Sequence, residues 1–219
     1  AGEQLKNYHI GFDLLLAMIS RVTFIPAHTL YFQVVPPILA LLIGVLSYKF
    51  CLSWTKSKGS AFWATFFVYF GGSWGPIVTL IRDGTIGSES MFWAQQSVST
   101  LINPPFALSL VLLLVGCSIL LRYNTQHKTM QLVLLSLVFG LLTQIKVYAG
   151  VLALGSLAWL SIYQLLRERK PHYLKVFLGS AFISALFFFP LNQRSSALLV
   201  WQPFWFLETM MAVSDRANW

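Results

Sequence analysis

Long apolar stretches separated by short polar connections constrain this chain more than any other feature. A bilayer has a hydrocarbon core about 30 Å thick, which a helix of about 20 apolar residues can cross. Six stretches reach or approach that length, at about residues 30–50, 61–81, 105–121, 130–145, 147–166 and 175–191. The sequence therefore predicts an all-α fold, a polytopic bundle of about six transmembrane helices.

Basic residues are unevenly divided between alternate connections. If Lys56 and Lys58 lie in the cytoplasm, the cytoplasmic connections hold nine basic residues and one acid, Glu168, against six of each on the other side. Lys and Arg near span ends set membrane orientation. The nine are Lys49, Lys56, Lys58, Arg122, Lys128, Arg167, Arg169, Lys170 and Lys175. This topology places most polar candidates for chemistry on the outer face.

Composition supports a membrane protein and argues against a nucleic-acid partner. Charged residues make up 10% of the chain, against about 25% in an average soluble domain. The net charge of +8 lies mainly in short cytoplasmic connections, where membrane orientation and contact with anionic membrane lipids explain it. We expect one multi-pass domain over residues 1–219, in a bacterial inner (cytoplasmic) membrane.

Three segments are expected on the outer side. Residues 1–29 form an interfacial segment, with helical apolar spacing between Tyr8 and Val22 and a break at Pro26. Residues 82–104 form a structured outer loop, and 192–219 a second one with amphipathic character. The Asn103-Pro104-Pro105 sequence marks the start of the next span, since proline is tolerated in a first helical turn.

Residues 130–166 are predicted to form a hairpin of two short spans. As one helix of 1.5 Å rise per residue they would reach roughly 55 Å, nearly twice the hydrocarbon core. Both flanking connections are basic and favour the cytoplasm. A turn at Gln144-Ile145-Lys146 satisfies length and charge together, and it places Lys146 on the outer side.

Several outer residues are candidates for binding a substrate. His9 and Asp13 stand four residues apart, so one helix face would carry both, and a carboxylate can orient an imidazole that grips a phosphate. Lys146 and Arg194 are cations that can hold a lipid-linked phosphate. Structural interpretations compete with these: His9 and Asp13 as surface groups, and Lys146 and Arg194 as basic side chains reaching the interface.

Known catalytic motifs give no further direction. The chain has no P-loop, HExxH or CxxC sequence, and its two cysteines form no pair or metal motif. Asp83 and Glu89 lie in the long outer loop without a second carboxylate at metal-ligand spacing. A divalent cation is thus supported by no motif, and the cofactor and the catalytic residue stay unassigned.

Four segments, taken in order, resemble membrane glycosyltransferases of the GT-C type, which include mannosyltransferase-like enzymes. They are YHIGFDLLLAMISRVT, FGGSWGP, LINPPFALSLVLLLVG and QIKVYAGVLAL. The resemblance implies transfer of a sugar from a polyprenyl-phosphate donor to an acceptor on the outer face. It also implies that His9, Asp13, Asn103 and Lys146 line the cavity for donor phosphate or acceptor.

Members of that class carry an acidic catalytic residue in their first outer loop. No residue of this sequence matches it, so we expect the chain to be a fragment whose catalytic loop precedes Ala1. Two other functions stay open: a transporter or flippase for lipid-linked saccharides, and a non-catalytic membrane assembly protein. A transporter would be expected to carry polar or charged groups within its spans, which here are almost uniformly apolar.

Overall fold

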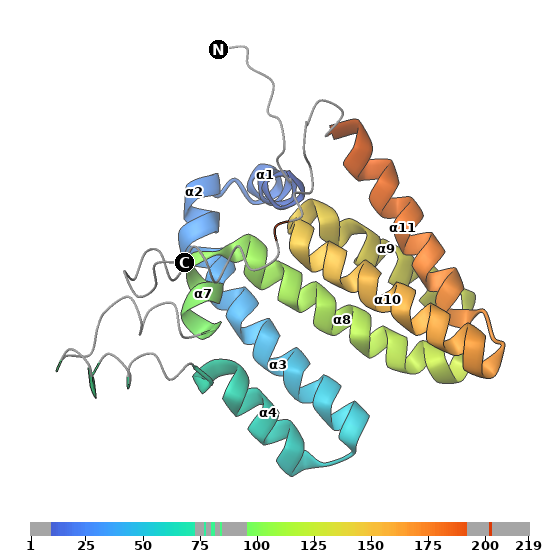
Figure 1. The fold of residues 1–219 in the computed structure, drawn as a ribbon. Coiled ribbons are helices and arrows are strands. Elements are labelled where there is room, and N and C mark those ends of the chain that lie inside the picture. Colours follow the sequence, from blue (N-terminus) through green and yellow to red (C-terminus); the bar gives the residue numbers. More distant parts are fainter. Residues whose placement is uncertain are drawn as a thin grey trace. The chain divides into compact units, whose positions relative to one another are not determined.

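A computed structural model of the chain describes residues 10–72, 77, 80, 81, 84, 96–191 and 202. Contacts divide the chain into two compact units, and His9–Pro190 is the unit that holds the helices discussed below. Regular structure in the described residues is helical throughout, which confirms the all-α bundle (Figure 1).

The first helix, α1 (Gly11–Thr23), packs one side against the bundle. Phe12 and Leu16 are buried, whereas Leu15 and Val22 of the same predicted apolar stripe are exposed and left for a membrane interface. Phe24 adopts the left-handed conformation with φ 59°, which ends α1 before Pro26 as predicted.

The first span runs from Ala27 to Thr55 through three contiguous elements. They are α2 (Ala27–Thr29), a π-helical segment η1 (Leu30–Val34) and α3 (Val35–Thr55). Pro36 and Pro37 have no N–H to bond four residues back, and their rings crowd the carbonyls there. The wider π turn, closed by the Val35 N–H on the Leu30 carbonyl, lets the helix continue into the prolines.

Four of the described helices are long and apolar enough to cross a bilayer. They span Ala27–Thr55, Pro104–Gln126 (α8), Val147–Glu168 (α10) and His172–Pro190, which is most of α11 (His172–Leu191). The shorter apolar helix α9 (Thr129–Ile145) has 17 residues and joins α10 at Lys146, where the hairpin turn was predicted. These helices mark an integral membrane protein.

Two further helices are shorter. Of the stretch predicted to span at 61–81, the structure describes α4 (Lys58–Phe70) as a continuous helix of 13 residues. Helix α7 (Gln96–Ile102) precedes α8, within the outer loop predicted to be structured.

The long helices alternate in direction. Tyr31, Asn103 and Tyr148 line one pocket, so the N-terminal ends of the first span, α8 and α10 lie together; we call this the pocket end. After the opposite end of α8, His127 stacks on His172 at the start of α11, with ring centres 3.7 Å apart. This alternation agrees with the one inferred from charge.

Small residues let α9 and α11 approach closely. A Cβ added to Gly140 of α9 would lie 2.6 Å from Ile183 Cβ of α11. Next to it the Ser184 hydroxyl donates a 3.0 Å hydrogen bond to the Thr143 hydroxyl. In a bilayer, apolar helix surfaces gain little free energy by leaving lipid, so close backbone approach and hydroxyl hydrogen bonds of this kind stabilise helix association.

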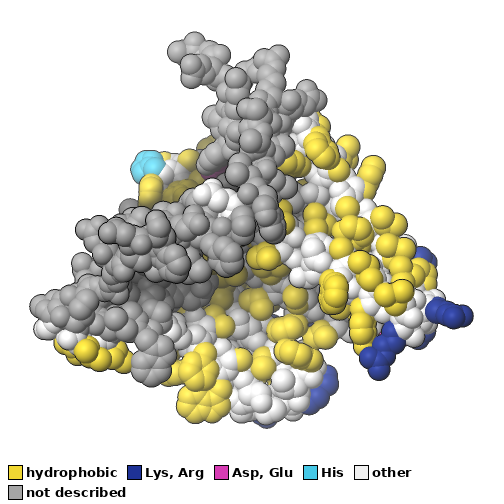
Figure 2. All heavy atoms as spheres, in the orientation of Figure 1, with side chains coloured by type: hydrophobic (Ala, Val, Ile, Leu, Met, Phe, Trp, Pro, Cys, Tyr) yellow, Lys and Arg dark blue, Asp and Glu magenta, His cyan; other side chains and the backbone are white. Residues whose placement is uncertain are grey.

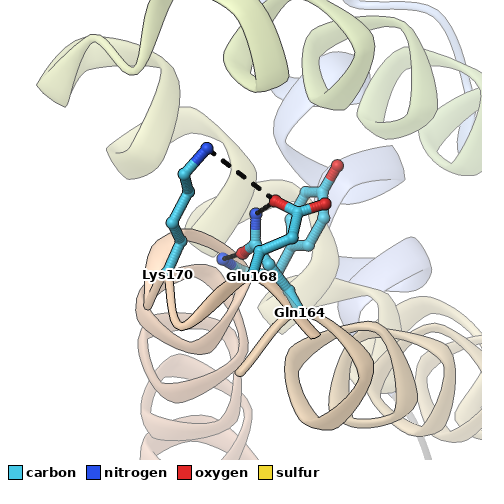
Figure 3. Close-up of polar contacts among 4 residues, drawn as sticks. Gln164, Glu168 and Lys170 are labelled. Atoms are coloured by element: carbon cyan, nitrogen blue, oxygen red, sulfur yellow. Dashed lines mark hydrogen bonds and ion pairs between the residues drawn. The ribbon is translucent and has the colours of Figure 1, made fainter. Parts of the chain in front are cut away.

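The turns opposite the pocket end form what we call the basic end, comprising residues 56–57, 127–128 and 169–171. Figure 2 shows Lys and Arg side chains gathered over the α3–α4 and α10–α11 turns, with hydrophobic side chains over the helices beyond them. Buried Gln164 braces the latter turn: its carbonyl oxygen accepts from the Tyr173 N–H at 3.2 Å and its amide donates to Glu168 (Figure 3). Lys170 lies 4.0 Å from the same carboxylate (Figure 3).

Candidate functional site at the pocket end

The starts of the first span, α8 and α10 border, together with α7, a pocket of about 490 Å³ that is open to the surface. Its lining combines three aromatic rings with polar side chains: Tyr31, Ser99, Ile102, Asn103, Phe106 and Tyr148. The volume lies within the range of about 300–1,000 Å³ that is common for small-molecule sites. Because each lining residue lies near a helix end, the pocket is placed where a bilayer would give way to water.

Asn103 holds the start of α8 and faces the pocket. Its Oδ1 accepts a 3.3 Å hydrogen bond from the Phe106 N–H, and its backbone carbonyl accepts from Ala107. Pro104 and Pro105 have no N–H, so the first turn of α8 has no backbone donor left for a ligand. The Asn103 Nδ2 amide, with no hydrogen bond among the described residues, is the donor that this helix end contributes.

Lys146 supplies the positive charge beside the pocket. It sits between α9 and α10 in extended backbone, and its Nζ lies 5.6 Å from the centre of the Tyr148 ring. Cation–π attraction holds an ammonium at such a distance from an aromatic ring. Partial burial lowers the pKa of the Lys146 ammonium from its ordinary value of 10.5, because the charged form loses hydration.

Asp13 lies in α1 next to Phe12 and is not among the described residues that line the pocket. Phe12 packs edge-on against the lining residue Tyr31, with ring centres 5.7 Å apart. Asp13 is exposed in the first turn of α1, where a negative charge also favours the helix dipole. The residue thus has a structural role at the start of α1.

Gln144, two residues before Lys146, is a buried amide. Both polar atoms of its side chain lack a hydrogen bond among the described residues, and it is 5% exposed. Its backbone lies under the start of α1, where a Cβ on Gly11 would come within 2.8 Å of the Gln144 carbonyl oxygen. An unsatisfied buried amide costs free energy, and such groups concentrate where a ligand or water completes the bonding.

The chemistry of this pocket favours an acceptor-rich, anionic ligand. The Asn103 amide and the tyrosine hydroxyls can donate hydrogen bonds, and Lys146 adds a cation at the edge. None of the described lining residues is a carboxylate. Within the described part of the chain, no cluster of three His, Cys, Asp or Glu could hold a metal ion.

Of the five predicted binding residues, Asn103 lines the pocket and Lys146 lies beside the lining residue Tyr148. Asp13 does not line the pocket, although its neighbour Phe12 contacts the lining residue Tyr31. The other two, His9 and Arg194, lie outside the described residues, so the predicted pairing of His9 with Asp13 stays a prediction.

The aromatic lining was not predicted. Tyr31, Phe106 and Tyr148 each lie within a few residues of a span end, a position that usually indicates interfacial anchoring. The signal that could have separated them from anchors is their clustering at the predicted outer ends of three different spans, next to Asn103 and Lys146.

Comparison of the chain with protein-family models, curated proteins and solved structures found no match.

Proposed function

We propose that this protein is a membrane glycosyltransferase that takes a sugar from a polyprenyl-phosphate donor, and that the pocket end holds the donor's phosphate and sugar. The observation that carries the proposal is the grouping of Lys146, Asn103 and three aromatic rings around one pocket at the membrane boundary. A lipid-linked sugar needs such a place, because its chain stays in the bilayer and its polar head lies at the surface.

Each part of the donor has a matching group. The ammonium of Lys146 offsets the phosphate charge, and the charge developing on that phosphate as the sugar leaves would be stabilised in the same way. The amide of Asn103 and the tyrosine hydroxyls donate to sugar or phosphate oxygens. The rings of Tyr31, Phe106 and Tyr148 offer apolar surface to the faces of a sugar ring.

Transfer also needs a carboxylate to take the proton of the acceptor hydroxyl. The described residues hold two carboxylates, Asp13 at the pocket end and Glu168 at the basic end, and neither lines the pocket. We therefore assign the described residues to donor binding and leave the base unassigned. The outer orientation of the pocket end rests on the charge asymmetry alone.

The test is a transfer assay on membranes that contain the protein. Labelled polyprenyl-phosphate mannose is supplied with membrane fractions as acceptor source, and release of label from the lipid is followed over time. The proposal expects the membranes to bind the labelled donor in a way that depends on the protein and falls in Lys146→Ala, and release of label that depends on the protein would identify transfer. Donor binding of wild-type strength in Lys146→Ala would contradict the assignment of the donor to the pocket end.

A further inference from the structure

A second hollow lies between α3 and α4, away from the pocket end. Its volume is about 370 Å³, and α3 contributes Leu41, Gly44, Val45, Tyr48 and Lys49 to its wall. From Leu41 to Lys49 the helix rises about 12 Å. The hollow is therefore a groove that runs along α3 toward the basic end.

The absence of a side chain at Gly44 lets α4 pack closely against α3 beside the groove. Tyr69 of α4 lies against Gly44, and its hydroxyl donates a 2.6 Å hydrogen bond to the Ala40 carbonyl. The Thr65 hydroxyl is likewise used, since it donates to the Ala61 carbonyl at 2.9 Å. With these hydroxyls already bonded to backbone carbonyls, the surface left to a ligand is apolar.

The two ends of the groove differ in chemistry. Leu41 and Val45 are exposed side chains of a candidate membrane span, so acyl chains surround them in a bilayer. At the other end Lys49 is exposed and has no ion-pair partner among the described residues. The adjacent Tyr48 hydroxyl has no hydrogen bond within the described part of the chain either. The apolar groove therefore ends at a cation and a hydrogen-bond donor.

We propose that this groove binds one anionic phospholipid, with an acyl chain along Leu41, Gly44 and Val45 and the phosphate paired with Lys49. Charge complementarity selects this occupant: an apolar chain joined to a negative head group matches an apolar groove that ends in a cation with no ion-pair partner among the described residues. Lys56 and Lys58 at the following turn raise the local positive charge further. The site is separate from the sugar-donor pocket and does not depend on it.

Native mass spectrometry of the full chain, reconstituted with equal amounts of phosphatidylglycerol and phosphatidylcholine, tests the proposal by counting retained lipids. Wild-type protein is expected to retain phosphatidylglycerol preferentially. Lys49→Gln is expected to lower that retention about fivefold, the effect of one basic residue at an anionic surface. Val45→Trp fills the groove and is expected to lower retention of both lipids.

Lys128→Gln is the matched control, because Lys128 lies at the basic end but outside the groove. It is expected to keep wild-type retention, and Lys49→Arg is expected to do the same. Unchanged retention in Lys49→Gln would overturn the proposal. An equal loss in Lys128→Gln would also overturn it, since diffuse surface charge would then explain the preference. Both lysines are surface residues, so this pair decides the question even if Val45→Trp fails to fold.

Discussion

The ammonium nitrogen of Lys146 lies 5.6 Å from the centre of the Tyr148 ring. Tyr148 lines the pocket, so this contact keeps the cation at the pocket edge. The contact places the ammonium beside the pocket, where a bound phosphate could pair with it, and the binding measurements below separate this role from a purely interfacial one.

Binding of a polyprenyl phosphate should weaken at alkaline pH. Burial lowers the pKa of Lys146 from 10.5, so the charge that attracts phosphate is present below that lowered pKa and is lost as the pH rises through it. The phosphate, with a second pKa of about 6, stays fully ionised across the same range. The affinity for polyprenyl phosphate can be measured by microscale thermophoresis between neutral pH and pH 10. We expect it to fall at a pH below the ordinary lysine pKa of 10.5.

Lys146→Arg is the control for this titration. A guanidinium keeps its charge throughout the range, so the Lys146→Arg protein should not show the loss of affinity that deprotonation of Lys146 causes. Ionisation of tyrosines would change the affinity of both proteins alike. An equal loss of affinity at alkaline pH in wild-type protein and Lys146→Arg would show that Lys146 is not the group responsible.

Asn103 is expected to serve both as a helix cap and as a ligand donor, and two substitutions separate these roles. Asn103→Ala removes the bond to Phe106 and should cost about 0.5–2 kcal/mol of stability. Asn103→Ser keeps a capping oxygen and should unfold close to the wild-type temperature. Both variants lose the Nδ2 amide, so both should bind polyprenyl phosphate more weakly; wild-type affinity in Asn103→Ser would limit Asn103 to capping.

Gly44→Ala should destabilise the contact between α3 and α4. The added methyl would meet the ring and hydroxyl of Tyr69, and overpacking of this kind costs about 1–3 kcal/mol. Thermal unfolding in detergent measures the loss, which Tyr69→Ala in the same protein should partly reverse.

Gly155→Ala provides the matched comparison for Gly44. Gly155 lies within α10 with open space around it, so alanine there should leave stability unchanged or raise it by about 0.4–1 kcal/mol. Equal destabilisation by the two substitutions would show that an effect common to both sites, such as the detergent, sets the cost, and not contact with Tyr69.

Features decided by local chemistry could be predicted from the sequence. The start of α8 after Asn103 follows from capping and paired prolines, and the turn at Lys146 follows from span length and flanking charge. The break near Pro26 has the same local origin. In each case residues within one or two helical turns decide the outcome.

Features that depend on distant segments could not be predicted. The pocket forms only because Tyr31, Phe106 and Tyr148, far apart in sequence, meet at the ends of three helices. Likewise nothing local to Gly44 reveals that the Tyr69 ring will lie against it. The apolar spacing of α1 also predicted no difference in burial between Leu15 and Leu16, whereas packing against the bundle buries only Leu16.

The affinity of the full chain for a polyprenyl phosphate, compared among single-lysine variants in nanodiscs, tests the central claim most directly. Lys146→Ala removes a charged contact and is expected to weaken binding about tenfold or more, whereas Lys146→Arg should retain most of it. Lys128→Ala, which removes a charge at the basic end, should bind like wild-type protein. Equal affinities of wild-type protein and Lys146→Ala, with both folded, would contradict the assignment of the donor phosphate to the pocket end.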